Sequence, residues 1–295
     1  MPTSRTKKPE YRDLTYNQLQ QLTIPEAQKM ASNTKKKKLS SIKQIFDIAI
    51  DPRYGYLDEN LAEPFLLKEP KKRGKAKAKI ERKPLSEENI NRLFHTEIFR
   101  QKVKTSQKTA HKYWIPLIAI YSGMRQNEIC QLHIEDIKNT TVNNETIYYF
   151  DINDREKKHL KNDNAQRSVP IHPQLIKLGL MEYIQTTAKQ HNRVFPQLRF
   201  HPIEERYNTD YNKTFMNFFR KNVTRDPSQV FHSLRHNVGD QLLKNAVKHR
   251  LPKDLMNQIM GHQPDRDETS QTYSQGYGIA ELFEGIKTIQ YETYI

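Results

Sequence analysis

The stretch VFHSLRHNVGD, residues 230–240, places His232 three residues before Arg235, with a further histidine directly after the arginine. Residues three apart lie on the same face of a helix, so we expect an imidazole and a guanidinium side by side. No carboxylate between Val230 and Gly239 could pair with them. The pattern therefore predicts a helix that presents one face to an anion.

The composition of the chain indicates which anion to expect. The 295 residues include 49 Lys and Arg against 34 Asp and Glu, a formal charge of +15 with a pI near 9.6. Such an excess predicts attraction to a polyanion, most often nucleic acid. No run approaches the roughly 18 apolar residues that span a bilayer, and the N-terminal residues lack the apolar core of a signal peptide. We therefore expect a soluble intracellular protein with no membrane partner.

Cofactor signals are lacking in the sequence. The single cysteine, Cys130, excludes an internal disulfide and a cysteine-based zinc cluster, and its apolar neighbours predict a small core residue. No metal-ligand constellation and no phosphate-binding glycine loop is recognisable. We expect no cofactor and no metal, which argues against a nuclease or a nucleotide hydrolase.

Charge and apolar periodicity divide the chain into three expected parts: a short helical DNA-binding domain at 1–67, a basic linker at 68–84 and a larger domain at 85–295. In the first part, apolar residues between Leu39 and Ala49 recur at helical spacing and predict a helix that buries one stripe. The linker has nine Lys or Arg and two Glu from Lys68 to Lys83 and almost no apolar content, so it cannot form a core.

Two groups of basic residues are candidates for contact with DNA phosphates. Four consecutive lysines begin the first helix, where the helix dipole disfavours them, and this suggests an external partner. Any single lysine of the linker could equally belong to a solvated tether. Taken together, the linker residues are better explained by contact with the DNA backbone, because neutralising its phosphates releases counterions. The candidate DNA-binding residues are Lys35, Lys36, Lys37, Lys38, Lys71, Lys72, Arg73 and Lys75.

The larger domain is expected to be mainly α with a small β-sheet, an α+β fold. Ser86 is a plausible N-cap, and the apolar run YWIPLIAIYSG predicts a helix that ends at Gly123. A further helix start follows at MRQNEICQLHIEDI. Segments 146–153 and 167–172 are rich in β-branched and aromatic residues and predict strands. The remaining segments, 212–223, 232–247, 252–262 and 279–289, read as helices.

Four clusters carry residues suited to one chemistry. Arg125 stands at a helix start with Glu128 one turn later, Lys161 lies in the turn before a strand, His232 and Arg235 share a helix face, and His262 precedes Tyr273 by eleven residues. Arginines hold a phosphate through forked hydrogen bonds, histidine moves protons near neutral pH, and a tyrosine activated by positive neighbours is a competent nucleophile. The set is coherent for metal-free phosphoryl transfer.

At these motifs the sequence resembles the tyrosine recombinases, or phage-type integrases. The motifs occur in family order: YSGMRQNEI, LKNDNAQRSVPIHP, FHSLRH, MGH and TSQTYSQGYG, which together cover roughly Lys83 to the C-terminus. The segment KKKKLSSIKQIFDIAID also looks like the end of the family's core-binding domain. That domain usually holds more helix than the first 67 residues supply, so the N-terminal part is expected to be abbreviated.

The resemblance implies a role for each residue. Tyr273 would attack a DNA phosphodiester to give a 3′-phosphotyrosine and a free 5′-hydroxyl, and Lys161 would be the general acid for the leaving 5′-oxygen. Glu128 would brace the site as a buried carboxylate. The implied catalytic set is Arg125, Lys161, His232, Arg235, His262 and the nucleophile Tyr273.

Several alternatives stay open on the sequence alone. Lys157 and Lys158 lie in the same predicted turn as Lys161, and Tyr277 follows Tyr273 by four residues. Arg125 with Glu128 could form a surface pair, and His262 could cap a helix. A type IB topoisomerase would use the same residues, and a DNA-binding protein with a relict site is a third interpretation.

The resemblance also implies partners and setting. Double-stranded DNA is the expected partner, with a monomer in solution, a homotetramer on synapsed sites, and an accessory DNA-bending protein as an optional further partner. The segment after Tyr273 resembles a tail that packs on a neighbouring subunit. We expect integration or excision of a mobile element in a bacterial cytoplasm, with the protein at the nucleoid.

Overall fold

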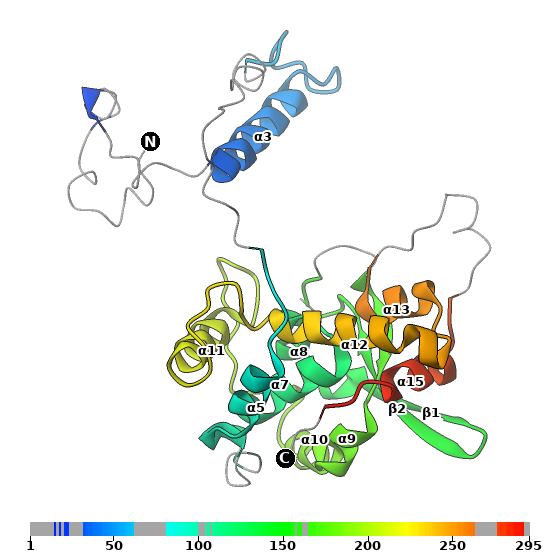
Figure 1. Cartoon of the computed structure of the whole chain (residues 1–295). Coiled ribbons are helices and arrows are strands. Elements are labelled where there is room, and N and C mark those ends of the chain that lie inside the picture. The colour runs from blue at the N-terminus through cyan, green and yellow to red at the C-terminus, as the bar shows by residue number, and fades with distance from the viewer. Residues whose placement is uncertain are drawn as a thin grey trace. The chain divides into compact units, whose positions relative to one another are not determined.

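The computed structural model describes residues 15, 18, 21–23, 32–61, 81–99, 104, 106, 108–156, 158–160, 165–262 and 276–291. The chain divides into two compact units, residues 1–78 and 79–295, and each is described by itself. The basic linker expected at 68–84 spans this division. Figure 1 shows the elements of both units.

The helix expected in the first unit is α3, Ser32–Ala49. Of its expected apolar stripe, Leu39, Phe46 and Ala49 are half-buried. Ile42 and Ile45 are 43% and 66% exposed in the described residues. Periodicity predicts which face of a helix is apolar, whereas burial needs a second element against that face. The helix was therefore predicted, and part of its apolar stripe is half-buried in the described residues.

The core of the second unit is built around α7, Ala110–Ser122. Trp114 and Leu117 are fully buried, and α7 is apolar on all sides, as expected of a helix surrounded by other elements. Gly123 ends α7 with a left-handed φ of 67°, and a Cβ at this position would lie 2.7 Å from Sδ of Met260. Glycine therefore lets the C-terminal end of another helix approach the end of α7.

The sheet has three antiparallel strands in the order β1, β2, β3. These are β1, Ile137–Val142, β2, Glu145–Ile152, and β3, Arg167–Pro170. Asn143 and Asn144 join β1 to β2 with φ values of 48° and 64°, the backbone of a type I′ hairpin turn. The hairpin projects from the helical body (Figure 1). β2 and β3 match the expected strands, whereas β1 was not predicted.

The remaining helices surround α7 and the sheet. Ser86 caps α5 as expected, since its side chain accepts a hydrogen bond from the backbone N–H of Asn89. The helix expected from residue 124 onward is only one short helix, α8, followed by a 3-10 turn. The bounds are α5 Glu87–Phe94, η3 Glu97–Phe99, α8 Gln126–Cys130, η4 Ile134–Asp136, α9 Pro173–Lys177, α10 Leu180–Ala188, α11 Thr209–Asn222, α12 Ser233–His249, α13 Lys253–Met260 and α15 Ile279–Lys287.

The C-terminal helix packs within its own chain. Leu282, Phe283 and Ile286 of α15 are buried, and α15 lies against β3 and α13. The buried face of α15 therefore stabilises the second unit itself. Contact of the segment after Tyr273 with a neighbouring subunit stays a prediction.

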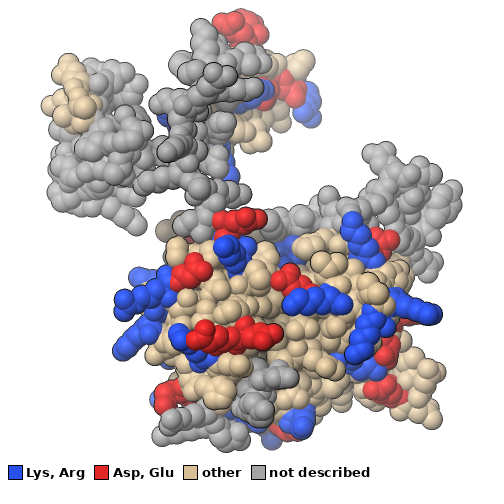
Figure 2. Space-filling view, viewed as in Figure 1, with Lys and Arg blue, Asp and Glu red and all other residues tan. Residues whose placement is uncertain are grey.

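The second unit is mainly α with one small sheet, so the expected α+β fold class is confirmed. Lys, Arg, Asp and Glu side chains are scattered over the face seen in Figure 2, and several Lys and Arg project at the edge where α11 lies. Of the helices in the described residues, none is both long enough and apolar enough to cross a membrane.

Candidate active site

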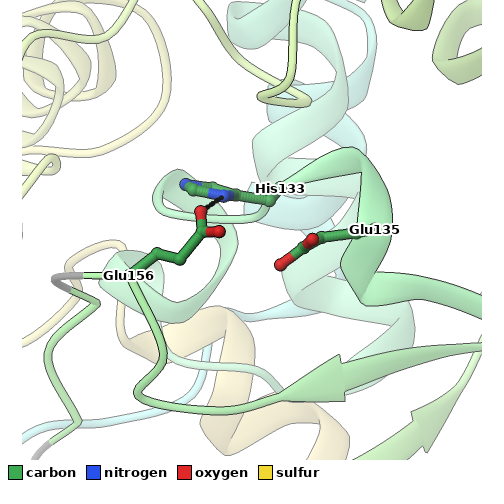
Figure 3. A group of neighbouring side chains, drawn as sticks. All are labelled: His133, Glu135 and Glu156. Atoms are coloured by element: carbon green, nitrogen blue, oxygen red, sulfur yellow. Dashed lines mark ion pairs between the residues drawn. The ribbon is translucent and has the colours of Figure 1, made fainter.

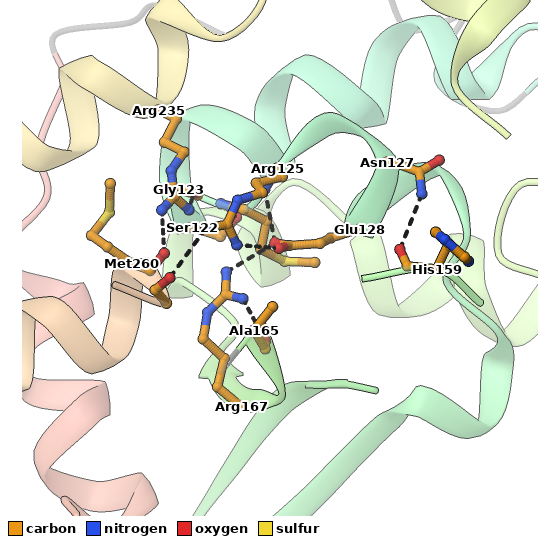
Figure 4. Close-up of polar contacts among 12 residues, drawn as sticks. Ser122, Gly123, Arg125, Asn127, Glu128, His159, Ala165, Arg167, Arg235 and Met260 are labelled. Carbon is orange, nitrogen blue, oxygen red and sulfur yellow. Dashed lines mark hydrogen bonds and ion pairs between the residues drawn. The ribbon is translucent and has the colours of Figure 1, made fainter. Parts of the chain in front are cut away.

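Arg125 is held at the entrance of α8 by a buried carboxylate. It occupies the N-cap position, with φ −72° and ψ 147°. Its Nη1 donates to Oε1 of Glu128 at 2.7 Å, and its backbone N–H donates to Oε2 of the same residue at 2.9 Å. The Glu128 side chain is 3% exposed. The pair is therefore a buried brace and not the surface pair that the spacing alone also allowed (Figure 4).

Arg235 projects from the first turn of α12 into the interior. It is 4% exposed, and its Nη1 donates to the carbonyl of Gly123 at 2.6 Å, while its Nη2 donates to the carbonyl of Met260. The guanidinium thereby joins the ends of α7 and α13 (Figure 4). His232, at the N-cap of α12, is exposed, and its ring centroid lies 5.0 Å from that of His236.

A third arginine completes the cluster, and the sequence interpretation missed it. Arg167, at the start of β3, donates from Nη2 to Oε2 of Glu128 at 2.9 Å and from Nε to the carbonyl of Ile259 at 3.0 Å. Its side chain is 3% exposed. The available signal was an arginine at the head of the apolar run VPI, since a buried strand rarely carries a charge without a partner.

Two of the three guanidiniums share one carboxylate. In the described part of the chain, Arg125 and Arg167 form ion pairs only with Glu128, and Arg235 forms none. Burial, together with the positive charges of Arg125 and Arg167, lowers the pKa of Arg235 to about 9. Burial opposes the ionisation of Glu128, but the two arginines outweigh it and its pKa stays below the usual value. The surplus positive charge is suited to an anion.

His262 lies beside this cluster. It follows Gly261, which ends α13 with φ 62°, and its backbone N–H donates to the carbonyl of Asn257 at 2.9 Å. Burial lowers the pKa of its imidazole, and Arg235 and Arg125 lower it further. A Cβ at position 261 would lie 2.9 Å from Nη1 of Arg167, so glycine is needed where the arginine side chain passes the end of α13.

The loop between β2 and β3, which carries the candidate lysines, is bonded near both ends to α8 or its C-cap. On one side, the backbone N–H of His159 donates to Oε1 of Gln131, the C-cap of α8, at 3.0 Å, and Nδ2 of Asn127 donates to the carbonyl of His159 at 3.4 Å. On the other side, Arg167 binds Glu128. Figure 4 shows the bond between Asn127 and His159 and the ion pair between Arg167 and Glu128.

Of the candidate lysines, only Lys158 lies within the described residues. Its Nζ donates to Oδ1 and Oδ2 of Asp136 at 2.7 and 2.8 Å, and the two side chains are 2% and 1% exposed. Lys158 is therefore occupied in a buried ion pair that anchors the loop. Lys157 and Lys161 lie outside the described residues.

The structure brings four of the six expected catalytic residues into one region and leaves the other two outside the description. The positions that lie outside are Lys161 and Tyr273. Among the expected DNA-binding residues, Lys35, Lys37 and Lys38 are exposed on α3, and Lys36 is on α3 with its side chain outside the description. The linker positions outside the described residues are Lys71, Lys72, Arg73 and Lys75.

A separate group of potential metal ligands lies at η4. Nδ1 of His133 is 2.9 Å from Oε2 of Glu156, and the ligand atoms of His133, Glu135 and Glu156 lie within 4.8 Å of one another (Figure 3). Among the residues that the structure describes, no other group of three is this close. The group does not touch the arginine cluster, and we assign it no step.

Comparison with known proteins adds the family. The family model described as the phage integrase family matches residues 83–277. No curated protein matches the sequence. Two solved structures resemble the chain: the Tn1549 transposon integrase in complex with circular intermediate DNA, at 16% identity over 85% of this chain and 78% of that one with a TM-score of 0.42, and a variant of that integrase with the same kind of DNA, at 14% identity over 81% and 74% with a TM-score of 0.40.

The family model spans more than half of the chain and includes the positions that form the arginine cluster. The order of the motifs along the sequence agrees with it. The chain therefore belongs to the phage integrase family and is a site-specific tyrosine recombinase.

Proposed function

We propose that this recombinase cuts and rejoins double-stranded DNA at specific sites through a 3′-phosphotyrosine intermediate on Tyr273. The observation that carries the proposal is the cluster of Arg125, Arg167 and Arg235 around a single carboxylate. A pentavalent phosphorane carries more negative charge than the phosphodiester from which it forms. Guanidiniums fixed against backbone carbonyls can stabilise that charge without reorganising during the reaction.

In the proposed cleavage step, the phenolic oxygen of Tyr273 attacks the phosphorus and the bond from phosphorus to the 5′-oxygen breaks. The phenolic proton passes to His232 or to water, and Lys161 protonates the leaving 5′-oxygen. Arg125, Arg235 and His262 bind the non-bridging oxygens. Attack by a 5′-hydroxyl of a partner strand then reverses the step, so the phosphoester bond is conserved and no ATP is consumed.

The choice of Lys161 over its neighbours is supported by the anchoring of the loop. Lys158 is held by Asp136 and cannot reach another group without breaking a buried ion pair. Lys161 lies between His159 and Arg167, and the bonds of these two residues fix both sides of the loop to the helix that Arg125 begins. Lys157 precedes the buried pair and stays the alternative.

For the assembly, we propose a monomer in solution and a homotetramer on two synapsed DNA sites, with an accessory DNA-bending protein as an optional partner. The reaction would integrate or excise a mobile element. The family match favours this exchange over the relaxation reaction of a type IB topoisomerase.

The proposal is tested by trapping on a nicked duplex that loses its 5′-hydroxyl fragment after cleavage. Because the positive charge comes from arginines, we expect a slowly migrating protein–DNA adduct in excess EDTA without ATP. Arg235→Gln should reduce its rate of formation by at least 10²-fold. An adduct that disappears in EDTA and returns with magnesium would overturn the mechanism.

A further inference from the structure

A second basic site lies outside the arginine cluster. A hollow of about 280 Å³ is lined by residues from the last turn of α5, the last turn of α11 and the segment that follows α11. Four of its seven lining residues are cations. These are Arg92, Arg220, Lys221 and Arg225.

The four cations do not have the same task. Arg220 donates to the carbonyls of Thr224, Asp226 and Gln229 at 3.1, 2.7 and 2.7 Å. Its guanidinium is thereby used to fold the loop from Thr224 to Gln229 into the wall of the hollow. It builds the site and leaves the other three cations to face a ligand.

These three cations are exposed and little compensated. Within the described residues, Lys221 and Arg225 have no carboxylate partner, and Arg92 pairs only with Glu88 at 2.5 Å. The side chains of that pair are 57% and 71% exposed, so a stronger anion can displace the carboxylate. The nearby carboxylate of Asp226 accepts the backbone N–H of Ser228 at 2.8 Å and does not line the hollow.

The helix dipole explains only part of the arrangement. Basic residues in the last turn of α11 stabilise that helix end, which accounts for Arg220 and Lys221. Arg92, in the last turn of α5, is favoured by the dipole of its own helix in the same way, whereas Arg225 lies beyond the end of α11 and belongs to no helix. Their convergence on one hollow fits a phosphate, which arginine binds through forked, charge-assisted hydrogen bonds.

The same loop receives the end of the basic linker. Nη1 of Arg82 donates to the carbonyl of Pro227 at 2.7 Å, and the backbone N–H of Lys83 donates to the carbonyl of Ser228 at 3.3 Å. The loop then leads directly to His232. The loop that helps to line the hollow therefore binds the end of the linker and leads to α12, the helix that carries Arg235. Lys and Arg also gather at the edge of the second unit where α11 lies (Figure 2).

We propose that Arg92, Lys221 and Arg225 bind one backbone phosphate of the DNA duplex, away from the bond that is cleaved. The inference rests on the proposed action on DNA and adds a second point at which the duplex is held. A phosphate contact positions the duplex and carries no sequence information.

The test measures duplex binding by fluorescence anisotropy as a function of KCl, with full-length protein in which the three residues are changed together to glutamine. Each phosphate contact contributes about 0.9 to the slope of log affinity against log salt. We expect the slope to fall by about 0.9 and the affinity for cognate and random duplexes to fall by the same factor. The rate of adduct formation at saturating protein should not change. The matched control carries glutamine at three exposed lysines on other surfaces: Lys177, Lys189 and Lys248.

A scan with one neutral methylphosphonate per duplex identifies the contact. At one position the wild type should lose the same slope, and the triple variant should lose nothing more. An unchanged slope in the triple variant, or an equal fall in the control, would overturn the inference. A wild-type chain that binds no duplex would remove the proposed function itself, and the inference with it.

Discussion

At the scale of single residues, the site depends on Glu128. This carboxylate accepts hydrogen bonds from the backbone and side chain of Arg125 and from Arg167. It is the one negative charge that the described structure places among the three guanidiniums, of which those of Arg167 and Arg235 are buried. Without it, the positive charges of Arg125 at the start of α8, Arg167 at the start of β3 and Arg235 on α12 would repel one another.

We predict that Glu128→Gln lowers the free energy of unfolding by about 3 kcal/mol, because it leaves Arg167 buried without its charge partner. Urea denaturation followed by fluorescence of the only tryptophan, Trp114, reports on the second unit. Sulfate should restore part of the loss by occupying the arginine cluster. Glu182→Gln, at an exposed position, is the control, and an equal loss there would contradict the assignment.

His172 is a second residue whose surroundings set a measurable property. Its Nδ1 accepts the backbone N–H of Gln174 at 3.0 Å, so Nε2 carries the proton and donates to the carbonyl of Ile289 at 2.9 Å. Burial lowers its pKa to about 4, and the bond to Ile289 opposes this shift only in part. Protonation would replace the accepting nitrogen with a donor facing Gln174.

We predict acid destabilisation from this histidine between pH 6.5 and pH 4. The folded pKa lies below the unfolded value of about 6.5, so the unfolded chain binds more protons in that window and stability falls as the pH falls. The loss of stability from this histidine is absent above pH 6.5 and reaches about 3 kcal/mol near pH 4. Because asparagine takes up no proton, the difference in free energy of unfolding between wild type and His172→Asn should shrink by about 3 kcal/mol from pH 7 to pH 4. A constant difference would show that the histidine is not buried in its neutral form.

At the scale of elements, the β2–β3 loop is where the lysine roles separate. Lys158 and Asp136 form a buried pair with partners 22 residues apart, and Asp136 also accepts Nδ2 of Asn153 at 2.8 Å. This pair fixes the base of the loop to η4. A lysine that anchors and a lysine that donates a proton should fail in different ways.

We predict that Lys161→Met slows cleavage by about 10² to 10⁴, the usual contribution of a general acid. A duplex with a 5′-bridging sulfur should restore the rate, because a thiolate leaves without protonation. Lys158→Met should instead lower the free energy of unfolding by about 3 kcal/mol. In single-turnover cleavage, the duplex with bridging sulfur should not raise the rate of this variant more than that of the wild type. Selective rescue of Lys157→Met would move the role of general acid to Lys157.

The elements that sequence reasoning predicted have strong apolar patterns. α7 is apolar throughout, α12 and α13 end near a glycine or a left-handed residue, and β2 and β3 are rich in aromatic and β-branched side chains. The strand β1, with sequence IKNTTV, is mostly polar and partly exposed, and only its pairing with β2 makes it a strand. Local propensity cannot show such pairing.

The site was predictable to the extent that its motifs are local. The spacing of Arg125 to Glu128 and the position of His232 at a helix start could be read directly. Arg167 and the pair of Lys158 with Asp136 could not, because their partners are distant in sequence and a lone basic residue near a turn is usually solvated. Three-dimensional contact, not composition, makes these residues part of the site.

At the scale of the whole molecule, a chain of net charge +15 contains two compact units, and the expected basic linker, residues 68–84, spans their boundary in the sequence. In the proposed function, the excess charge holds a duplex without regard to sequence, and the arginine cluster receives one phosphate for reaction. All of this depends on one claim, that Tyr273 becomes joined to DNA.

The most direct measurement is mass spectrometry of the trapped adduct after nuclease and trypsin digestion. Cleavage after Arg266 and Lys287 gives a peptide that contains both Tyr273 and Tyr277, and fragmentation separates the two positions. We expect a nucleotide joined through its 3′-phosphate to Tyr273 in the wild type and no adduct from Tyr273→Phe. A nucleotide on Tyr277, or an adduct that survives Tyr273→Phe, would contradict this expectation.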